Sequence, residues 1–215
     1  MGNRLDDMLE SLNIELIRMG SLCEDAISTA TNALIKDEGL LERVVEIENE
    51  INEMERKIEN MCMKILLRRQ PVAKDLRLIS SALKMISDLE RIGDQALDIS
   101  KIAKFINKNH GRYEKLEKMA RAAIKMVTES IDSFVNKDLE LAHKVMADDD
   151  IVDELFNEIK SDVIEKISHS GEDGEYLADV LMVAKYFERI GDHSVNVAEW
   201  VEYSITGSHV KQREQ

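Results

Sequence analysis

Apolar residues recur along the chain with the spacing of amphipathic helices. The clearest case is the segment from about 40 to 69, where Val44, Ile51, Ile58 and Ile65 repeat every seven residues. A seven-residue apolar row on one side of a helix is typical of helices that pack into bundles. The pattern and its interruptions predict six helices, at about 5–36, 40–69, 74–109, 114–136, 139–168 and 175–205.

Residues that favour turns are rare, and they gather between the predicted helices. The chain has one Pro and nine Gly in 215 residues, too few for a loop-rich β-sandwich, whereas 44% of its residues are hydrophobic and can form a large core. We therefore expect an all-α protein. Turns are expected at Gly39, at Gln70–Pro71, within 107–111, at Lys137–Asp138 and within 171–174.

The two halves of the chain repeat each other. Glu48 corresponds to Asp149, 101 positions later. The match is strongest near the end of each half, where Glu90–Asp94 and Glu188–Asp192 both read Glu-Arg-Ile-Gly-Asp. A repeat of this length makes the six helices three plus three. The sequence thus predicts two tandem three-helix bundles, over residues 1–110 and 111–215.

Acidic residues interrupt apolar rows at corresponding places in the two halves. Glu90 stands in a seven-residue row that is otherwise leucine, where a core residue is expected, and Asp94 follows one turn later on the same side of the helix. Glu188 and Asp192 repeat this arrangement. Partly buried carboxylates without partners are costly, so we expect a positive group beside them.

The second helix of each half supplies facing side chains. A short turn joins the second and third helices, so they are antiparallel neighbours and their polar positions stand at similar heights. Four side-chain oxygen donors per half then suit a hard cation such as Mg²⁺, Mn²⁺, Ca²⁺ or iron. The candidate ligands are Glu48, Asn52, Glu90 and Asp94 in the first half and Asp149, Asp153, Glu188 and Asp192 in the second.

Salt bridges in a solvated groove are the alternative explanation of these acids, with Arg91, Arg189 or Lys185 as partners. Gly93 and Gly191 favour the metal. A glycine inside a helix costs about 1 kcal/mol, which is explained if another group must approach the backbone closely at that point.

Charge and cysteine content exclude several classes of function. The formal net charge of −14 repels polyanions, so neither nucleic acid nor a bare anionic membrane is expected as a partner. Cys23 and Cys62 lack a CxxC spacing and are expected in the core. With no signal peptide and no apolar run long enough to cross a bilayer, we expect a cytoplasmic protein.

Three motifs of the first half form a specific combination. They read Glu48-x-x-Ile51-Asn52-x-Met54-Glu55, Arg69-Gln70-Pro71-x-x-x-Asp75-Leu76-Arg77 and Leu89-Glu90-Arg91-Ile92-Gly93-Asp94. The second copy ends in Glu188-Arg189-Ile190-Gly191-Asp192-His193. Over essentially the whole chain, these motifs resemble the PhoU family of phosphate-signalling regulators.

The resemblance implies two three-helix bundles side by side, with multinuclear iron or zinc held by paired acidic motifs in some members. Asn52 departs from a four-acid site, so we expect the first site to bind metal more weakly or not at all. By position, the implied ligands are Glu48, Glu90 and Asp94 in the first bundle and Asp149, Asp153, Glu188 and Asp192 in the second.

The resemblance also implies a non-enzymatic role in phosphate homeostasis. Such a regulator restrains a phosphate-specific ABC transporter and keeps a membrane sensor histidine kinase in its phosphate-replete state. Contact with the membrane is then expected only through these protein partners, without insertion. The sequence leaves open whether the chain is a monomer or a homodimer.

Three other functions compete with this one. A carboxylate-bridged metal enzyme of the ferritin-like type needs two Glu-x-x-His motifs, and the chain has one, Glu140-Leu-Ala-His143. A phosphotransfer bundle needs an exposed histidine, for which His193 is the candidate. A metal-free helical adaptor is the third, and metal content distinguishes it. No nucleophile arrangement, phosphate-binding glycine loop or nucleotide fingerprint is present, which favours a regulator over a catalyst.

Overall fold

The computed structural model of the protein describes residues 4–36, 39–69, 72–106, 114–169 and 173–208. These residues form helices and no strand, which confirms the all-α prediction. Wherever both ends are described, the predicted limits agree within one residue; 107–109, predicted to end the third helix, lie outside the described residues. The helices are α1 (Arg4–Lys36), α2 (Leu41–Arg69), α3 (Ala73–Ile106), α4 (Glu114–Asn136), α5 (Leu139–His169) and α6 (Gly174–Thr206).

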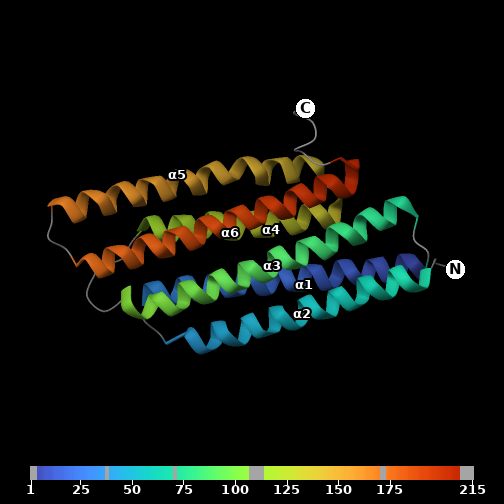
Figure 1. Cartoon of the computed structure of the whole chain (residues 1–215), viewed down its shortest axis with the longest axis horizontal. Coiled ribbons are helices and arrows are strands. Elements are labelled where there is room, and N and C mark those ends of the chain that lie inside the picture. Colours follow the sequence, from blue (N-terminus) through green and yellow to red (C-terminus); the bar gives the residue numbers. More distant parts are fainter. Residues whose placement is uncertain (1–3, 37–38, 70–71, 107–113, 170–172, 209–215) are drawn as a thin grey trace.

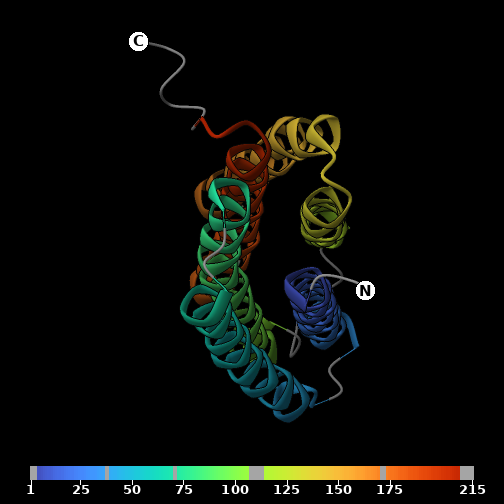
Figure 2. The ribbon, with the colours of Figure 1, turned by 90° about the vertical axis from the view of Figure 1, so that its right-hand side faces the viewer.

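The helices lie in two layers. Helices α2, α3, α6 and α5 lie side by side in that order, and α1 and α4 form a second layer behind them (Figure 1). The end-on view places α1 and α4 next to each other on one side of the molecule (Figure 2). The molecule is elongated because its helices, of 23 to 34 residues, run along its long axis (Figure 1).

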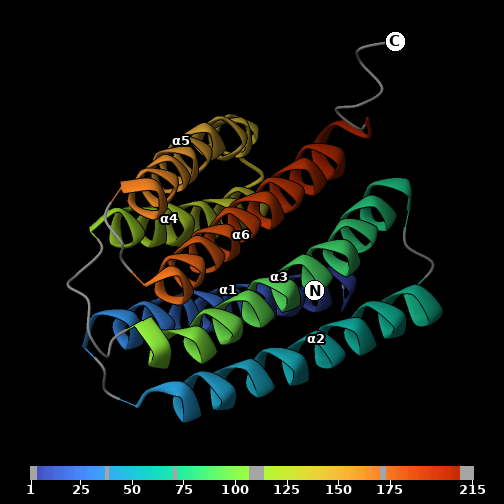
Figure 3. The same cartoon turned by 60° about the vertical axis from the view of Figure 1, so that its left-hand side comes forward.

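Each half of the chain forms its own three-helix bundle. Helices α1, α2 and α3 all contact one another, as do α4, α5 and α6. The bundles join through α1 with α4 and through α3 with α6, so corresponding helices meet at the junction. Two tandem three-helix bundles are thus confirmed, whereas the boundary between residues 110 and 111 lies outside the described residues and stays a prediction. In Figure 3, the end of α2 and the start of α3 lie at the opposite end of the molecule from the end of α5 and the start of α6.

The apolar row predicted on the second helix is the core-facing side of α2. Val44, Ile51, Ile58 and Ile65 are all fully buried. Cys23 and Cys62 are buried free thiols, as predicted. No helix in the described part of the chain contains a stretch apolar enough to cross a membrane.

The turns that fall within the described residues use the expected residue types. Gly39 has φ of +59° before α2, and Lys137 has φ of +55° before α5. Asp173 accepts a hydrogen bond from the Glu175 backbone at the start of α6, so Gly174 belongs to the helix and not to the turn. Left-handed Gly207 ends α6. The turns predicted at 70–71, 107–111 and 171–172 lie outside the described residues.

Candidate metal centres

In the second bundle, the carboxylate of Asp149 on α5 enters the space that Gly191 leaves open on α6. A Cβ atom on Gly191 would lie 2.8 Å from Asp149 Oδ1 and 3.5 Å from Val152. Asp149 Oδ1 is shielded from solvent and has no hydrogen-bond partner. Because burying an unpaired oxygen is unfavourable, Asp149 lacks the positive group or donor that its position calls for.

The other predicted ligands of this bundle act on Asp149 through their charge. Burial and, to a smaller extent, the charges of Asp153, Asp192 and Glu188 together raise the pKa of Asp149 from 3.8 to about 6. Burial also raises the pKa of Asp192, and the charge of Glu188 adds to the rise. The facing helices α5 and α6 therefore concentrate negative charge where the sequence predicts a metal site.

Lys185 is a cation already present beside the second set. Its ammonium group donates to both carboxylate oxygens of Glu188, at 2.5 Å each. It also lies over the ring of Phe156 and opposes the rise in the pKa of Asp192. The salt-bridge alternative is thus realised at Glu188, but it leaves Asp149 Oδ1 without a partner.

The first set of predicted ligands satisfies its own polar groups. Asn52 donates its amide to Glu48 Oε1 at 2.6 Å. The Arg91 guanidinium lies 3.3 Å from Glu90 and 2.8 Å from Asp94. Burial raises the pKa of Glu90 and the charge of Asp94 adds to the rise, whereas Arg91 opposes it. The salt-bridge alternative describes this set well.

Both interior glycines allow the second helix of a bundle to approach the third. A Cβ atom on Gly93 would lie 2.9 Å from Ile51 Cδ1. Ile51 corresponds to Val152, which contacts the same position at Gly191. The close approach expected from the sequence is therefore made by the neighbouring helix, with a carboxylate added to it only in the second bundle.

The row that contains Glu90 is half-buried, not part of the core as its leucines suggested. Leu76 is exposed, and Leu83 and Leu97 are only partly buried. The reason is that a neighbouring face of α3, with Leu89, supplies the fully buried residues. The acids consequently stand at the rim of the contact between helices, where an ion from solvent can reach them.

The two sets differ in how well they fit a cation. Within the described ranges, no three Asp, Glu, His or Cys side chains converge closely enough to share one ion as they stand. The second set nevertheless has the chemistry of a hard-cation site, with four carboxylates and one buried oxygen that has no partner. The first set does not fit, because a guanidinium and an amide already occupy its oxygens.

One polar contact was missed by the sequence analysis. Asp88 Oδ1 on α3 lies 2.9 Å from His193 Nδ1 and accepts the Asn196 amide at 3.1 Å, both across the contact with α6. The residue of the second repeat that corresponds to Asp88 is Tyr186, so the repeat contained no signal for it. His193 is mostly buried and bound to Asp88, which is unlike the exposed histidine of a phosphotransfer bundle.

The histidine of the Glu140-Leu-Ala-His143 motif pairs with a carboxylate of another helix and not with a second Glu-x-x-His motif. His143 Nε2 lies 3.1 Å from the buried carboxylate of Glu202 on α6. The described residues contribute no third metal-binding side chain at this place. This contact therefore gives no support to a ferritin-like centre.

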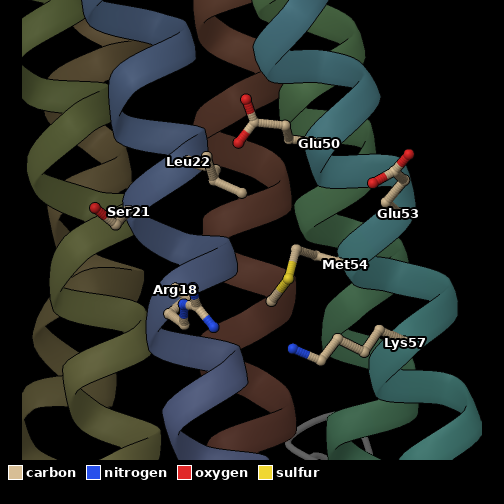
Figure 4. Close-up of a pocket in the computed structure, with 7 residues that line it drawn as sticks. All are labelled: Arg18, Ser21, Leu22, Glu50, Glu53, Met54 and Lys57. Carbon is tan, nitrogen blue, oxygen red and sulfur yellow. The ribbon is translucent and has the colours of Figure 1, made fainter.

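A groove between α1 and α2 lies apart from both acidic sets. Its volume is about 490 Å³. Figure 4 shows Leu22 and Met54 in its middle, with Arg18 and Lys57 toward one end and Glu50 toward the other. Both cations already pair with Glu15, at 3.5 Å from Arg18 and 2.6 Å from Lys57. The groove contains none of the predicted ligands, and its cations are neutralised from within the protein.

Comparison with known proteins relates both bundles to one family. The PhoU domain matches residues 16–103 and again 116–201. The chain belongs to the PhoU family. The two matched regions coincide with the two bundles, so each bundle is one PhoU domain.

Relatives within the PhoU family match nearly the whole chain. A Clostridium acetobutylicum protein, 38% identical over 94% of both chains, is named phosphate-specific transport system accessory protein PhoU homolog. The Escherichia coli K12 accessory protein PhoU is 34% identical over 93% of this chain and 84% of its own. The crystal structure of PhoU from Pseudomonas aeruginosa superposes with a TM-score of 0.90 at 35% identity, covering 95% of this chain and all of that one.

Proposed function

We propose that the chain is an accessory regulator of a phosphate-specific transport system. The observation that carries this proposal is the match of both bundles to the PhoU domain, together with full-length relatives named as accessory proteins of such systems. The molecule works by binding other proteins and not by catalysis. Its partners are the phosphate-specific ABC transporter and a membrane sensor histidine kinase, which it meets in the cytoplasm.

The direction of regulation is negative. When phosphate is plentiful, the protein restrains uptake and keeps the kinase in its phosphate-replete state. Long, rigid helices suit this role because they offer two similar surfaces, one per bundle, at fixed separation. Two partners can then be held at the same time.

Metal binding is confined to the second bundle in this proposal. Asp149, Asp153, Glu188 and Asp192 would hold the cation, and Glu188, which now accepts from Lys185, would then be shared between the cation and the lysine. The buried oxygen of Asp149 supports this assignment, because a cation supplies the partner it lacks. Mg²⁺, Mn²⁺, iron or zinc bound at these residues would offset the repulsion among the four carboxylates and would supply a positive centre for an anionic group of a partner or for phosphate.

Deleting the gene in its host tests the regulatory role. We expect phosphate uptake and phosphate-responsive transcription to stay high in phosphate-rich medium, and the wild-type gene to restore repression. Unchanged uptake and transcription in the deletion strain would contradict the proposal. Co-purification of the tagged chain with the transporter's ATPase subunit and with the kinase, from the host membrane fraction, tests the partners directly.

Metal analysis of the purified protein tests the second site separately. We expect the Glu188→Ala, Asp192→Ala double variant to lose bound metal. The matched control, Glu90→Ala with Asp94→Ala in the first bundle, is expected to retain it. Equal and negligible metal in all three proteins would overturn the metal assignment and leave the regulatory proposal intact.

A further inference from the structure

The stretch of sequence that runs from the end of α2 into the start of α3 has a charge opposite to that of the whole chain. Residues 64–77 contain five basic side chains and one acidic side chain, in a protein of net charge −14. The corresponding stretch of the second repeat, residues 165–175, contains four acidic side chains and one lysine. The end of α2 and the start of α3 lie at the opposite end of the molecule from the end of α5 and the start of α6 (Figure 3), so the basic and the acidic stretch are far apart.

The same end exposes large aliphatic side chains. Leu67 at the end of α2 is 79% exposed, and Val72 just before α3 is 67% exposed. These are the two most exposed large apolar residues in the described part of the chain. We define the α2–α3 tip by its exposed apolar and basic residues, which are Met63, Lys64, Leu67, Val72, Lys74 and Leu76.

The lysines of the α2–α3 tip are available to an outside partner. Lys64 and Lys74 are exposed, and no carboxylate of the described residues pairs with either. The start of α1 lies at the same end and adds the exposed acids Asp6 and Asp7. In the sequence, the five basic residues of 64–77 still outnumber the acids Asp6, Asp7 and Asp75.

We propose that the α2–α3 tip binds directly to an anionic lipid surface. In Figure 1 the ends of α2 and α3 project beyond the C-terminal end of α6, so a flat surface can touch the tip without meeting the acidic body. Aliphatic side chains enter the boundary between headgroups and acyl chains, while neighbouring lysines remain among the headgroups. Beside the tip, a cavity of about 340 Å³ with walls of Leu66, Leu76 and Leu83 continues the apolar surface.

The charge distribution also fixes the orientation of binding. An anionic bilayer attracts basic segments only within about a Debye length, roughly 10 Å. The helices of the first bundle, with 29 to 34 residues, are about four to five times as long. When the α2–α3 tip is bound, the acidic end of α5 and start of α6 therefore lie too far from the bilayer to be repelled by it. Net charge predicted no contact with a bare anionic membrane, but it averages over two ends that differ in sign.

Vesicle flotation with the full chain tests this proposal. Vesicles of phosphatidylcholine with an equal part of phosphatidylglycerol are expected to carry the protein upward, and vesicles of phosphatidylcholine alone are not. Replacing Lys64 and Lys74 by Gln should weaken binding about fivefold for each lysine. Leu67→Glu with Val72→Glu should abolish binding, and raising the salt concentration should weaken it.

The second repeat offers a matched control. Ile164 and Ile167 are 55% and 60% exposed near the end of α5. Ile164→Glu with Ile167→Glu removes a similar apolar area from the acidic end and should leave vesicle binding unchanged. All variants change exposed residues, so unchanged circular dichroism and unchanged melting temperature show that the fold is retained.

A fluorescence measurement shows which end touches the lipid. The chain has one Trp, Trp200. In a Trp200→Phe background, the tryptophan fluorescence of the Leu67→Trp variant should shift to the blue when phosphatidylglycerol vesicles are added. The fluorescence of the Ile167→Trp variant in the same background should not shift.

Three results overturn the proposal: no binding to phosphatidylglycerol vesicles at low salt, equal binding by Leu67→Glu with Val72→Glu, or equal loss in the Ile164 and Ile167 control. If the α2–α3 tip instead binds an acidic segment of a protein, the wild-type protein will not float with the vesicles either. The regulatory role stands or falls by the deletion experiment, which does not depend on lipid.

Discussion

Asp88 on α3 and His193 on α6 are hydrogen-bonded across the junction of the two bundles, with 2.9 Å between Asp88 Oδ1 and His193 Nδ1. Both side chains are mostly buried, at 16% and 19% exposed. The same Asp88 oxygen also accepts the amide of Asn196. One carboxylate thus satisfies two donors of the other bundle, at a junction formed otherwise mainly by apolar residues.

Removing this carboxylate should weaken the junction. Asp88→Ala leaves the donors of His193 and Asn196 without an acceptor, so we expect the free energy of unfolding to fall by about 1–3 kcal/mol. Urea denaturation measures the change. Asp98→Ala is the control, because Asp98 pairs with Lys101 on its own exposed helix face at 2.9 Å, and its loss should cost less than about 1 kcal/mol. Equal losses in the two variants would contradict a special role for Asp88.

The close approach of α5 to α6 should make Gly191 sensitive to the smallest enlargement. The added methyl of Gly191→Ala meets Asp149 Oδ1 at 2.8 Å, and overpacking of about 1–3 kcal/mol outweighs the gain of about 1 kcal/mol in helix propensity. We expect a net loss of about 1 kcal/mol in chemical denaturation. In an Asp149→Ala background the loss should disappear, and Gly174→Ala, which meets nothing within 4 Å, should be neutral or slightly stabilising.

Asp149 should change the stability of the protein in opposite directions with and without metal. In chelator-treated protein, Asp149→Asn removes one of four neighbouring negative charges and should raise the free energy of unfolding by about 1 kcal/mol. With Mn²⁺ at about a hundred times Kd, the wild type should gain about 2.7 kcal/mol and the variant much less. Thermal denaturation with and without Mn²⁺ measures both effects, and parallel shifts in the two proteins would argue against Asp149 as a ligand.

The start of α6 should show a pH dependence of its own. Burial raises the pKa of Asp179 above its ordinary value of 3.8, and the charges of Glu175 and Asp173 add to the rise. The folded protein therefore binds this proton more tightly than the unfolded chain does, and stability falls as the pH rises through this window. Asp179→Asn should raise the melting temperature at about pH 7 and have little effect at about pH 3. A shift of the same size at both pH values would show that the carboxylate charge is not the cause.

The helices and the repeat could be predicted because both produce a regular spacing of residue types along the sequence. Val44, Ile51, Ile58 and Ile65 all point to the core, since a seven-residue row stays on one side of a helix. The facing arrangement of the acids followed from the antiparallel path of the second and third helices. Spacing does not show how deeply a side chain is buried. For that reason the row that contains Glu90 was expected in the core, although it is half-buried.

The difference between the two acidic sets was only partly predictable. Asn52 predicts a weaker first site, which stays a prediction, and in the structure its amide donates to Glu48. The role of Arg91 could not be decided, because both repeats contain the same arginine and only side-chain packing shows whether it covers the acids. Lys185 has Ser87 as its counterpart, and Asp88 has Tyr186. Features that differ between the repeats were therefore the ones that needed three-dimensional information.

The junction of corresponding helices, α1 with α4 and α3 with α6, has the form of a symmetric homodimer whose two subunits have been fused into one chain. In a true homodimer, Asp88 would meet the equivalent of its own Gln95 and not a histidine. The hydrogen bond to His193 depends on a difference in sequence between the two halves. It therefore stabilises the pairing of each half with the other half of the same chain.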